Sequence, residues 1–408
     1  MTKAHEMPCL PIFDQLPLIK FQNCPAQYAA FAHEDFHQAK NFLLSYQANS
    51  ATFNSYRREV ERLLQWAWQI AQKSVRDLKR ADIEGYISFC QNPPPAWIGL
   101  KKLPRFLDKK GQRVPHPDWR PFVATISKTA HQHGQRPSRT DYRLSSKSLR
   151  EIFTITGVFY NFLIQEDYTT LNPVLHIRQK SRFLQHHQSK AKVRRLTELQ
   201  WHYVIETAEI MADNSPVHER TLFIMTALYS LYLRISELAA SKRWTPTMGD
   251  FYRDPDGLWW FSTVGKGNKA RQIAVSDDLL KALRRYRIAL GLSPLPLTGD
   301  ATPLVAKQRG KGPMSSTSQI RIIVQACFDQ ASTRLRQDSF LDEADSLLAA
   351  TVHWLRHTGI SEDVKYRPRE HVRDDAGHSS SVVTDRYIDI ELRARHASSK
   401  KKRIKPEG

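Results

Sequence analysis

The chain is poor in cysteine and has no long apolar run. Its 408 residues include only Cys9, Cys24, Cys90 and Cys327, which are widely spaced and form no C-x-x-C pair. A disulfide framework or a zinc finger is therefore not expected. No apolar run approaches the ~20 residues that a membrane-spanning helix requires. Residues 1–21 lack the apolar core and cleavage site of a secretory signal, so we expect a cytoplasmic protein with reduced thiols.

Acidic residues are scarce relative to basic ones. The chain carries 61 Lys and Arg against 41 Asp and Glu, a formal net charge of +20. Such a field attracts polyanions, so nucleic acid is the expected partner. An anionic membrane surface is the alternative, but no amphipathic anchoring helix is evident and we expect no membrane role.

The first half of the sequence predicts a helical domain at 38–178, after an N-terminal extension at 1–37. Between Thr52 and Trp68, apolar residues recur at three- and four-residue intervals, which indicates an amphipathic helix. A basic segment at about 93–145 interrupts this pattern and shows little periodicity. We expect that segment to be an insertion that becomes ordered only on a partner.

A basic linker at 179–195 separates this domain from the next. Arg178–Arg195 contains seven Lys and Arg and no acidic residue. One interpretation is a solvated tether; the other, which we favour, is a segment that neutralises DNA phosphates and releases counterions. The predicted DNA-binding residues are Arg178, Lys180, Arg182, Lys190 and Lys192.

The second domain is predicted at 196–392, with a basic tail at 393–408. Thr197 is a candidate helix cap. A β-hairpin is predicted from 252–264 and 271–275, because the intervening Gly and Asn residues favour a turn. Helices are expected at 219–241, 277–290, 316–335, 341–358 and 382–392, and Gly359 is a candidate stop for the fourth.

Six residues of the last third combine into one possible chemistry. They are Arg234, Lys266, His353, Arg356, His378 and Tyr387. Transfer of a phosphodiester requires positive charge on its non-bridging oxygens, a nucleophile and a proton for the leaving alkoxide. No Asp/Glu set has convincing metal-site spacing, so arginine forks would have to supply the charge. Nearby cations would also stabilise a phenolate, whose reference pKa is ~10.

Each residue alone has a structural interpretation. Arg234 could pair with Glu237, three residues later on a predicted helix. Lys266 could belong to an ordinary basic turn, and Lys269 competes with it as a proton donor. An isolated Tyr387 would be a core or surface tyrosine. The ordered spacing of all six favours the chemical interpretation.

The strings LYLRISEL, VGKGNKAR, HWLRHT and AGHSSSVVTDRY resemble the catalytic domain of the tyrosine recombinases, the phage-integrase family. The resemblance implies a mainly α fold with a small β-hairpin, in which a SAM-like core-binding domain and the catalytic domain form a C-shaped clamp. It implies that Tyr387 is the nucleophile and Lys266 the general acid, and that the two arginines and two histidines bind the phosphate. Lys269 and Arg271 would contact the DNA backbone.

The resemblance further implies a site-specific recombinase or integrase that works through a 3′-phosphotyrosyl intermediate, without a metal or cofactor. Its partner would be double-stranded DNA with specific recombination sites. We expect a homotetramer on DNA, a monomer in solution, and an accessory recombinase or directionality factor. The basic insertion favours a mobile element, and DNA binding would place the protein at the bacterial nucleoid. A type IB topoisomerase-like enzyme and a catalytically silent DNA-binding regulator are the alternatives.

Two features near the candidate site depart from the family pattern. Tyr232 stands where glycine is common, two residues before Arg234. The segment 361–376 replaces a usually apolar helix, and Ala376 stands where leucine is frequent. We expect these departures to loosen the helix packing behind His378.

Overall fold

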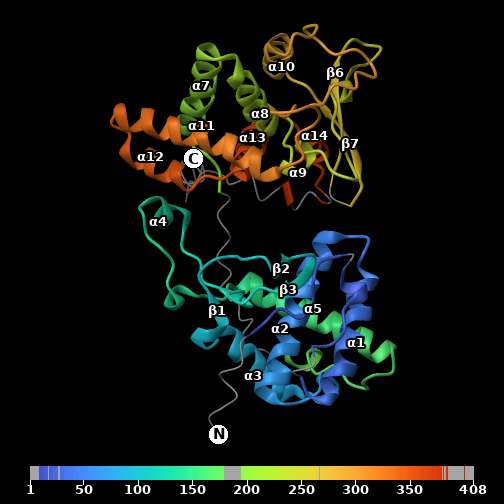
Figure 1. Ribbon diagram of the computed structural model, residues 1–408. Helices are drawn as coiled ribbons and strands as arrows, with labels where there is room; N and C mark the ends of the chain where they lie inside the picture. The colour runs from blue at the N-terminus through green and yellow to red at the C-terminus, as the bar shows by residue number, and fades with distance from the viewer. Residues whose placement is uncertain are drawn as a thin grey trace, which may run out of the picture. The chain divides into compact units, whose positions relative to one another are not determined.

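The computed structural model describes residues 9–16, 18–25, 28–178, 194–265, 267–378, 380, 383, 384 and 399. Several predicted site residues therefore lie outside the described residues: Lys266, Tyr387, Lys180, Arg182, Lys190 and Lys192, together with the side chain of Arg178. The chain divides into two compact units, 1–189 and 190–408. Both are mainly helical with small sheets (Figure 1), which confirms the predicted fold class. The clamp stays a prediction.

Unit 1 is a helical bundle whose core is rich in aromatic side chains. Phe42, Phe53 and Phe159 are fully buried and come from three different helices. Asn49 caps the second helix by accepting hydrogen bonds from two backbone amides. The helices are α1 (Ala30–Ser45), α2 (Ser50–Trp66), α3 (Arg80–Gln91), α5 (Ser146–Gln165) and α6 (Leu175–Arg178). Single-turn segments are η1 (Leu18–Phe21), η2 (Ala67–Ala71) and η3 (Val75–Asp77).

The basic insertion has regular structure and packs on the helices of unit 1. Buried Trp97, Trp119 and Phe122 anchor it. Its elements are η4 (Pro95–Trp97), β1 (Ile98–Gly99) paired parallel with β4 (Phe122–Val123), β2 (Phe106–Lys109) paired antiparallel with β3 (Gln112–Pro115), α4 (Lys128–Gln132) and η5 (Arg139–Asp141). The expectation that it is ordered only on a partner is wrong, because aromatic side chains such as Trp97 and Phe122 join the core of unit 1.

Unit 2 packs its helices around α8, which is buried on most of its surface. In Figure 1, α7, α10, α11 and α13 surround it. The helices are α7 (Glu198–Asn214), α8 (Glu219–Ser230), α9 (Ile235–Leu238), α10 (Asp277–Ala289), α11 (Thr317–Gln337), α12 (Leu341–Leu348), α13 (Val352–Asp363) and α14 (Arg369–Ala376), with η7 (Pro216–His218) and η8 (Met248–Asp250). The predicted cap at Thr197 is confirmed, since its hydroxyl accepts from the Gln200 amide.

A three-stranded antiparallel sheet completes unit 2. Its order is β5 (Phe251–Arg253), β6 (Trp259–Val264) and β7 (Ala270–Ala274). The predicted hairpin is thus confirmed as β6 and β7, although its first segment contains a further turn between β5 and β6. The register pairs Val264 with Ala270, so the described part of the intervening turn lies at the end of the hairpin.

Two predicted helices are interrupted. The one expected at 219–241 ends at Ser230, and Tyr232 takes the left-handed φ of 48° that a helix cannot contain. The one expected at 341–358 breaks between α12 and α13. Gly359 lies inside α13 and is not its stop; a Cβ there would lie 2.2 Å from the carbonyl oxygen of Tyr229. The glycine instead permits close packing of α13 on α8.

Among the described residues, no helix is long and apolar enough to cross a membrane.

Candidate active site

Four of the six predicted chemical residues are described, and unit 2 brings them together. Arg234 immediately precedes α9, His353 and Arg356 lie on α13, and His378 follows α14. The positive charges of Arg356 and Arg234 act on both histidines and lower the pKa of each, after burial. The candidate site therefore collects residues from three separate segments; of the helices next to these residues, α14 lies beside β7 (Figure 1).

A buried carboxylate organises the arginines on one side of the site. Glu237 is 2% exposed and accepts from Arg234 Nη1 at 3.0 Å. It also accepts from Arg271 Nη1 at 3.0 Å and Nη2 at 2.7 Å. Burial alone would raise the pKa of Glu237, but the hydrogen bonds and charge of Arg271, with Arg234, lower it. The carboxylate is therefore ionised at neutral pH and fixes both guanidiniums.

The predicted alternative pairing of Arg234 with Glu237 is confirmed, but its setting differs from the prediction. Arg234 is not inside a helix; it is the cap residue of α9, with extended backbone at φ −75° and ψ 145°. Its side chain stays 30% exposed while Nη1 makes the ion pair. The part of the side chain that stays exposed is accessible to a ligand.

Arg271 is held on several sides and is almost buried. Its Nε donates to the carbonyl of Asp375 at 2.9 Å, in addition to the pair with Glu237. A Cβ at Gly265 or at Gly377 would lie 2.9 Å from atoms of Arg271, so both glycines leave room for it. This arrangement supports a role in holding the site. Lys269 is exposed on the turn between β6 and β7.

Arg356 is positioned by main-chain groups. It is 2% exposed, donates from Nη1 to the carbonyl of Tyr232, and donates from Nη2 to the carbonyl of Ala376 at 2.6 Å. Tyr232 and Gly377 both have left-handed backbone, at φ 48° and 63°. These turns direct the carbonyls of Tyr232 and Ala376 at the guanidinium, which fixes the plane of the fork.

The side chain of Tyr232 closes the packing behind Arg356. Its phenol donates to Asp363 Oδ2 and accepts from Arg367 Nη1 at 3.0 Å. Arg367 also pairs with Asp363 at 3.0 Å and with Asp375 at 2.5 Å. Tyr232, Ile360, Val372 and Ala376 are all fully buried in one small cluster. The expected loosening of this region is therefore wrong, because the tyrosine ring fills the space.

The imidazoles of the site are held neutral. Burial, then the charges of Arg356, Arg234 and Arg271, lowers the pKa of His378 to about 4. Its Nδ1 lies 2.9 Å from Thr384 Oγ1. Burial and Arg356 also lower the pKa of His353. Neutral imidazoles at pH 7 can donate one hydrogen bond to a phosphate without adding charge.

His357 also lies at the site, although it was not among the predicted site residues. Its ring centroid lies 4.2 Å from that of His353, one helical turn earlier on α13. Burial, then the charges of His353 and Arg356, lowers its pKa to about 4. The spacing of four residues was the signal that could have identified it.

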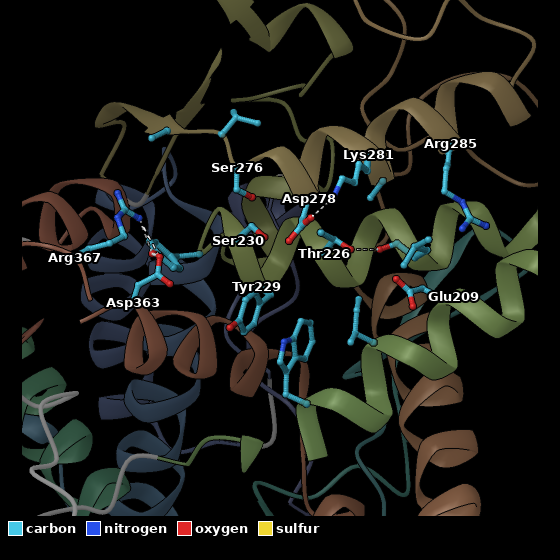
Figure 2. Close-up of a pocket in the computed structure, with 17 residues that line it drawn as sticks. Glu209, Thr226, Tyr229, Ser230, Ser276, Asp278, Lys281, Arg285, Asp363 and Arg367 are labelled. Carbon is cyan, nitrogen blue, oxygen red and sulfur yellow. Dashed lines mark hydrogen bonds and ion pairs between the residues drawn. The ribbon is translucent and has the colours of Figure 1, made fainter. Parts of the chain in front are cut away.

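A cavity of about 800 Å³ lies behind the site and is separate from it. In Figure 2, Arg367 and Asp363 lie at one end, Asp278 of α10 lies near the middle, and Lys281 and Arg285 of α10 lie toward the other end. None of the four described chemical residues lines it. Tyr232 lines the cavity and also contacts Arg356 through its carbonyl, so it separates the cavity from the site.

In the part of the chain that the structure describes, no three His, Cys, Asp or Glu side chains are placed to hold a metal ion. The charged groups that could bind a phosphate here are guanidiniums.

Sequence comparison finds relatives among recombinases. No family model matches the chain. A stretch of 147 residues is 31% identical to tyrosine recombinase XerD of Rickettsia bellii, covering 36% of this chain and 44% of the relative. Tyrosine recombinase XerC of Xylella fastidiosa is 24% identical over 279 residues, 67% of this chain and 68% of the relative. The chain spans less than half the length of the XerD relatives it matches.

Structure comparison extends the likeness to both units. The XerH site-specific recombinase bound to palindromic difH substrate aligns with TM-score 0.55 at 12% identity, covering 90% of this chain and 87% of that one. A lambda integrase dimer bound to a COC′ core site aligns with TM-score 0.50 at 13% identity, covering 92% and 79%. The Tn1549 transposon integrase with circular-intermediate DNA aligns with TM-score 0.50 at 15% identity, covering 90% and 98%. At these identities the likeness establishes a shared fold.

Proposed function

We propose that this chain, which belongs to the tyrosine recombinase/integrase family, cuts and rejoins double-stranded DNA at specific recombination sites. The observation that carries the proposal is the convergence of Arg234 and Arg356 with the neutral imidazoles of His353 and His378. Two fixed guanidiniums and two neutral donors are suited to the oxygens of one phosphodiester.

In the proposed reaction, Tyr387 releases its hydroxyl proton to solvent and attacks phosphorus as a phenolate, which forms a 3′-phosphotyrosyl bond. The bond from phosphorus to the 5′ oxygen breaks, and Lys266 gives that oxygen a proton. The 5′ hydroxyl of a partner strand then attacks the phosphotyrosine and returns a proton to Lys266, and Tyr387 leaves as a phenolate that takes up a proton from solvent. Each step exchanges one phosphoester bond for another, so no external energy source is required. Arg234 and Arg356 stabilise the charge that develops on the non-bridging oxygens.

The proposed partner is DNA carrying two recombination sites, bound by four copies of the chain. A mobile element remains the proposed setting, with an accessory recombinase or directionality factor as a further partner. The exposed Lys269 and the basic linker are proposed to contact DNA phosphates.

The test is covalent capture on a nicked suicide substrate that carries candidate element-end DNA, followed by a denaturing gel. We expect a protein–DNA band with the natural chain and none with Tyr387→Phe. Arg356→Ala should reduce the rate of adduct formation by at least a hundredfold, as removal of one oxyanion donor does. Arg284→Ala removes an exposed charge on α10 and is the matched control. If the chain binds the candidate DNA but forms no covalent adduct, the catalytically silent DNA-binding regulator is favoured. If it relaxes supercoiled DNA that has no specific site, the topoisomerase-like enzyme is favoured.

The same assay separates the two candidate general acids. A substrate with sulfur in place of the 5′ bridging oxygen releases a thiolate, which needs no proton. Lys266→Ala should be defective on ordinary DNA and restored on the sulfur substrate, whereas Lys269→Ala should not be restored. The reverse pattern would assign the proton to Lys269.

A further inference from the structure

Unit 1 contains a cavity of about 670 Å³ that is distinct from the candidate active site. It is bounded by α2, by the β2–β3 hairpin of the insertion, and by segments 119–125 and 142–144. This volume lies in the range of sites that hold small molecules or single nucleotides. Most of its boundary comes from the insertion, and none of the described residues predicted to bind DNA lines it.

Positive charge dominates the lining of this cavity. Among the described residues that line it, eight are Lys or Arg and three are Asp or Glu. No described carboxylate lies within ion-pair distance of Arg57, Arg120 or Arg143. These three arginines donate instead to backbone carbonyls and to one side-chain amide oxygen. Glu61 and Asp14 act on the charge of Arg57 from beyond ion-pair distance, so the charges of Arg120 and Arg143 are the most available to an anion.

Arg57 has an unmet hydrogen-bond donor. Its Nε is buried and has no hydrogen-bond partner among the described residues, although its two terminal nitrogens donate to the carbonyl of Asp14 and to Asn54 Oδ1. Burial, and then the charge of Arg105, lowers the pKa of Arg57 to about 10. A buried donor without an acceptor is costly, so a ligand oxygen that reached this nitrogen would stabilise the site.

Other arginines of the lining are held in fixed planes. Arg62 stacks over the ring of Phe122, and Arg105 stacks over the ring of Trp119, each with 4.7 Å from guanidinium carbon to ring centroid. Each is also paired with a buried carboxylate of α2. These two arginines are thus held in place before a ligand binds, which reduces the conformational entropy lost on binding.

We propose that this cavity binds the phosphate group of a nucleotide, with Arg57, Arg120 and Arg143 as its ligands. A phosphate has the charge and the several acceptor oxygens that arginine forks match, whereas a carboxylate would use fewer of the donors. The phosphate can belong to a free nucleotide or to a DNA backbone, and the two sources share this chemistry. The site is independent of strand cleavage.

The test measures binding of deoxyadenosine monophosphate to the full chain carrying Tyr387→Phe, by titration calorimetry at low salt. We expect saturable binding at one site and none with deoxyadenosine, which lacks the phosphate. Arg120→Gln and Arg143→Gln should each weaken binding about tenfold, the effect of one lost charge-assisted hydrogen bond. Arg57→Gln should weaken binding to the same extent. If the Arg57 variant fails to fold, the variants at the less buried Arg120 and Arg143 still test the proposal.

Arg150→Gln is the matched control, because Arg150 is an exposed arginine of α5 in the same unit that does not line the cavity. Equal weakening by this control, or no saturable binding of the monophosphate, overturns the proposal. Displacement of the bound monophosphate by duplex DNA of unrelated sequence identifies a backbone phosphate as the source, and lack of displacement identifies a free nucleotide. Because the chain used cannot cleave DNA, failure of the proposed recombinase activity does not affect this result.

Discussion

Glu237 binds Arg271 through both carboxylate oxygens, at 3.0 and 2.7 Å, and the same carboxylate accepts from Arg234. One buried acid thus sets the position of an arginine from β7 and of the arginine that caps α9. Breaking a buried pair leaves an uncompensated charge, which costs more than the pair contributes when intact.

Replacement of Glu237 by Gln should therefore lower the free energy of unfolding by about 3 kcal/mol at pH 7. It should also slow adduct formation, since Arg234 loses its fixed position. Chemical denaturation measures the first effect and covalent capture the second. Glu370→Gln, at an exposed glutamate in the first turn of α14, is the control. Equal stability of the two variants would show that Glu237 does not hold the arginines.

The lowered pKa of Glu237 gives this stabilisation a defined pH range. A carboxyl whose pKa is lower in the folded than in the unfolded chain stabilises fully above its unfolded value, about 4.5, and loses this effect as the pH falls through the folded value. The difference in stability between the natural chain and Glu237→Gln should therefore shrink below pH 4.5. A difference that stays constant down to pH 3 would contradict this.

The buried histidines predict a second dependence of stability on pH, at higher pH than the effect of Glu237. The pKa values of His357 and His378 fall to about 4 from the usual 6.5, so the unfolded chain binds more protons between these values. Stability should be complete above pH 6.5 and decrease as the pH falls towards 4. Melting temperature against pH measures this slope. His378→Asn should flatten it, and His202→Asn, at an exposed position on α7, should not.

Gly359 and Gly157 form a matched pair of helical glycines. A Cβ at Gly359 would lie 2.2 Å from the Tyr229 carbonyl oxygen, whereas one at Gly157 would lie 3.9 Å from its nearest neighbour, Val174. Gly359→Ala should destabilise the chain by about 3 kcal/mol and displace α13 with Arg356. Gly157→Ala should stabilise it by up to about 1 kcal/mol through helix propensity. Similar denaturation midpoints for both variants would contradict the close packing of α13 on α8.

Tyr232 should tolerate loss of its hydroxyl better than loss of its ring. Tyr232→Phe removes hydrogen bonds to Asp363 and Arg367, which remain paired with each other, and should cost about 1–2 kcal/mol. Tyr232→Gly relieves the left-handed backbone but empties a fully buried site, and should cost about 3 kcal/mol or more. Chemical denaturation of both variants measures the two free energies of unfolding. If Tyr232→Gly were as stable as Tyr232→Phe, relief of backbone strain would outweigh the loss of packing.

The predicted site residues lie in short local strings, whereas the contacts that hold them come from distant parts of the chain. Arg356 and His378 could be selected because the strings HWLRHT and AGHSSSVVTDRY carry them. The end of α8 at Ser230 was missed because Tyr232 continues the apolar periodicity, and nothing local shows that a tyrosine will take positive φ. The order of the insertion was missed because its arginines find carboxylates far away in sequence, such as Asp14 for Arg113 and Glu61 for Arg105.

Because both hydrogen-bond acceptors of Arg356 are backbone carbonyls, its position depends directly on the backbone conformation. It depends only indirectly on which side chains the acceptor residues carry. Position 232 can hold a tyrosine and position 376 an alanine, because each contributes an oxygen that every amino acid possesses. The side chains at these two positions can therefore change to suit neighbouring contacts. Such a change leaves the two carbonyl acceptors of Arg356 in place.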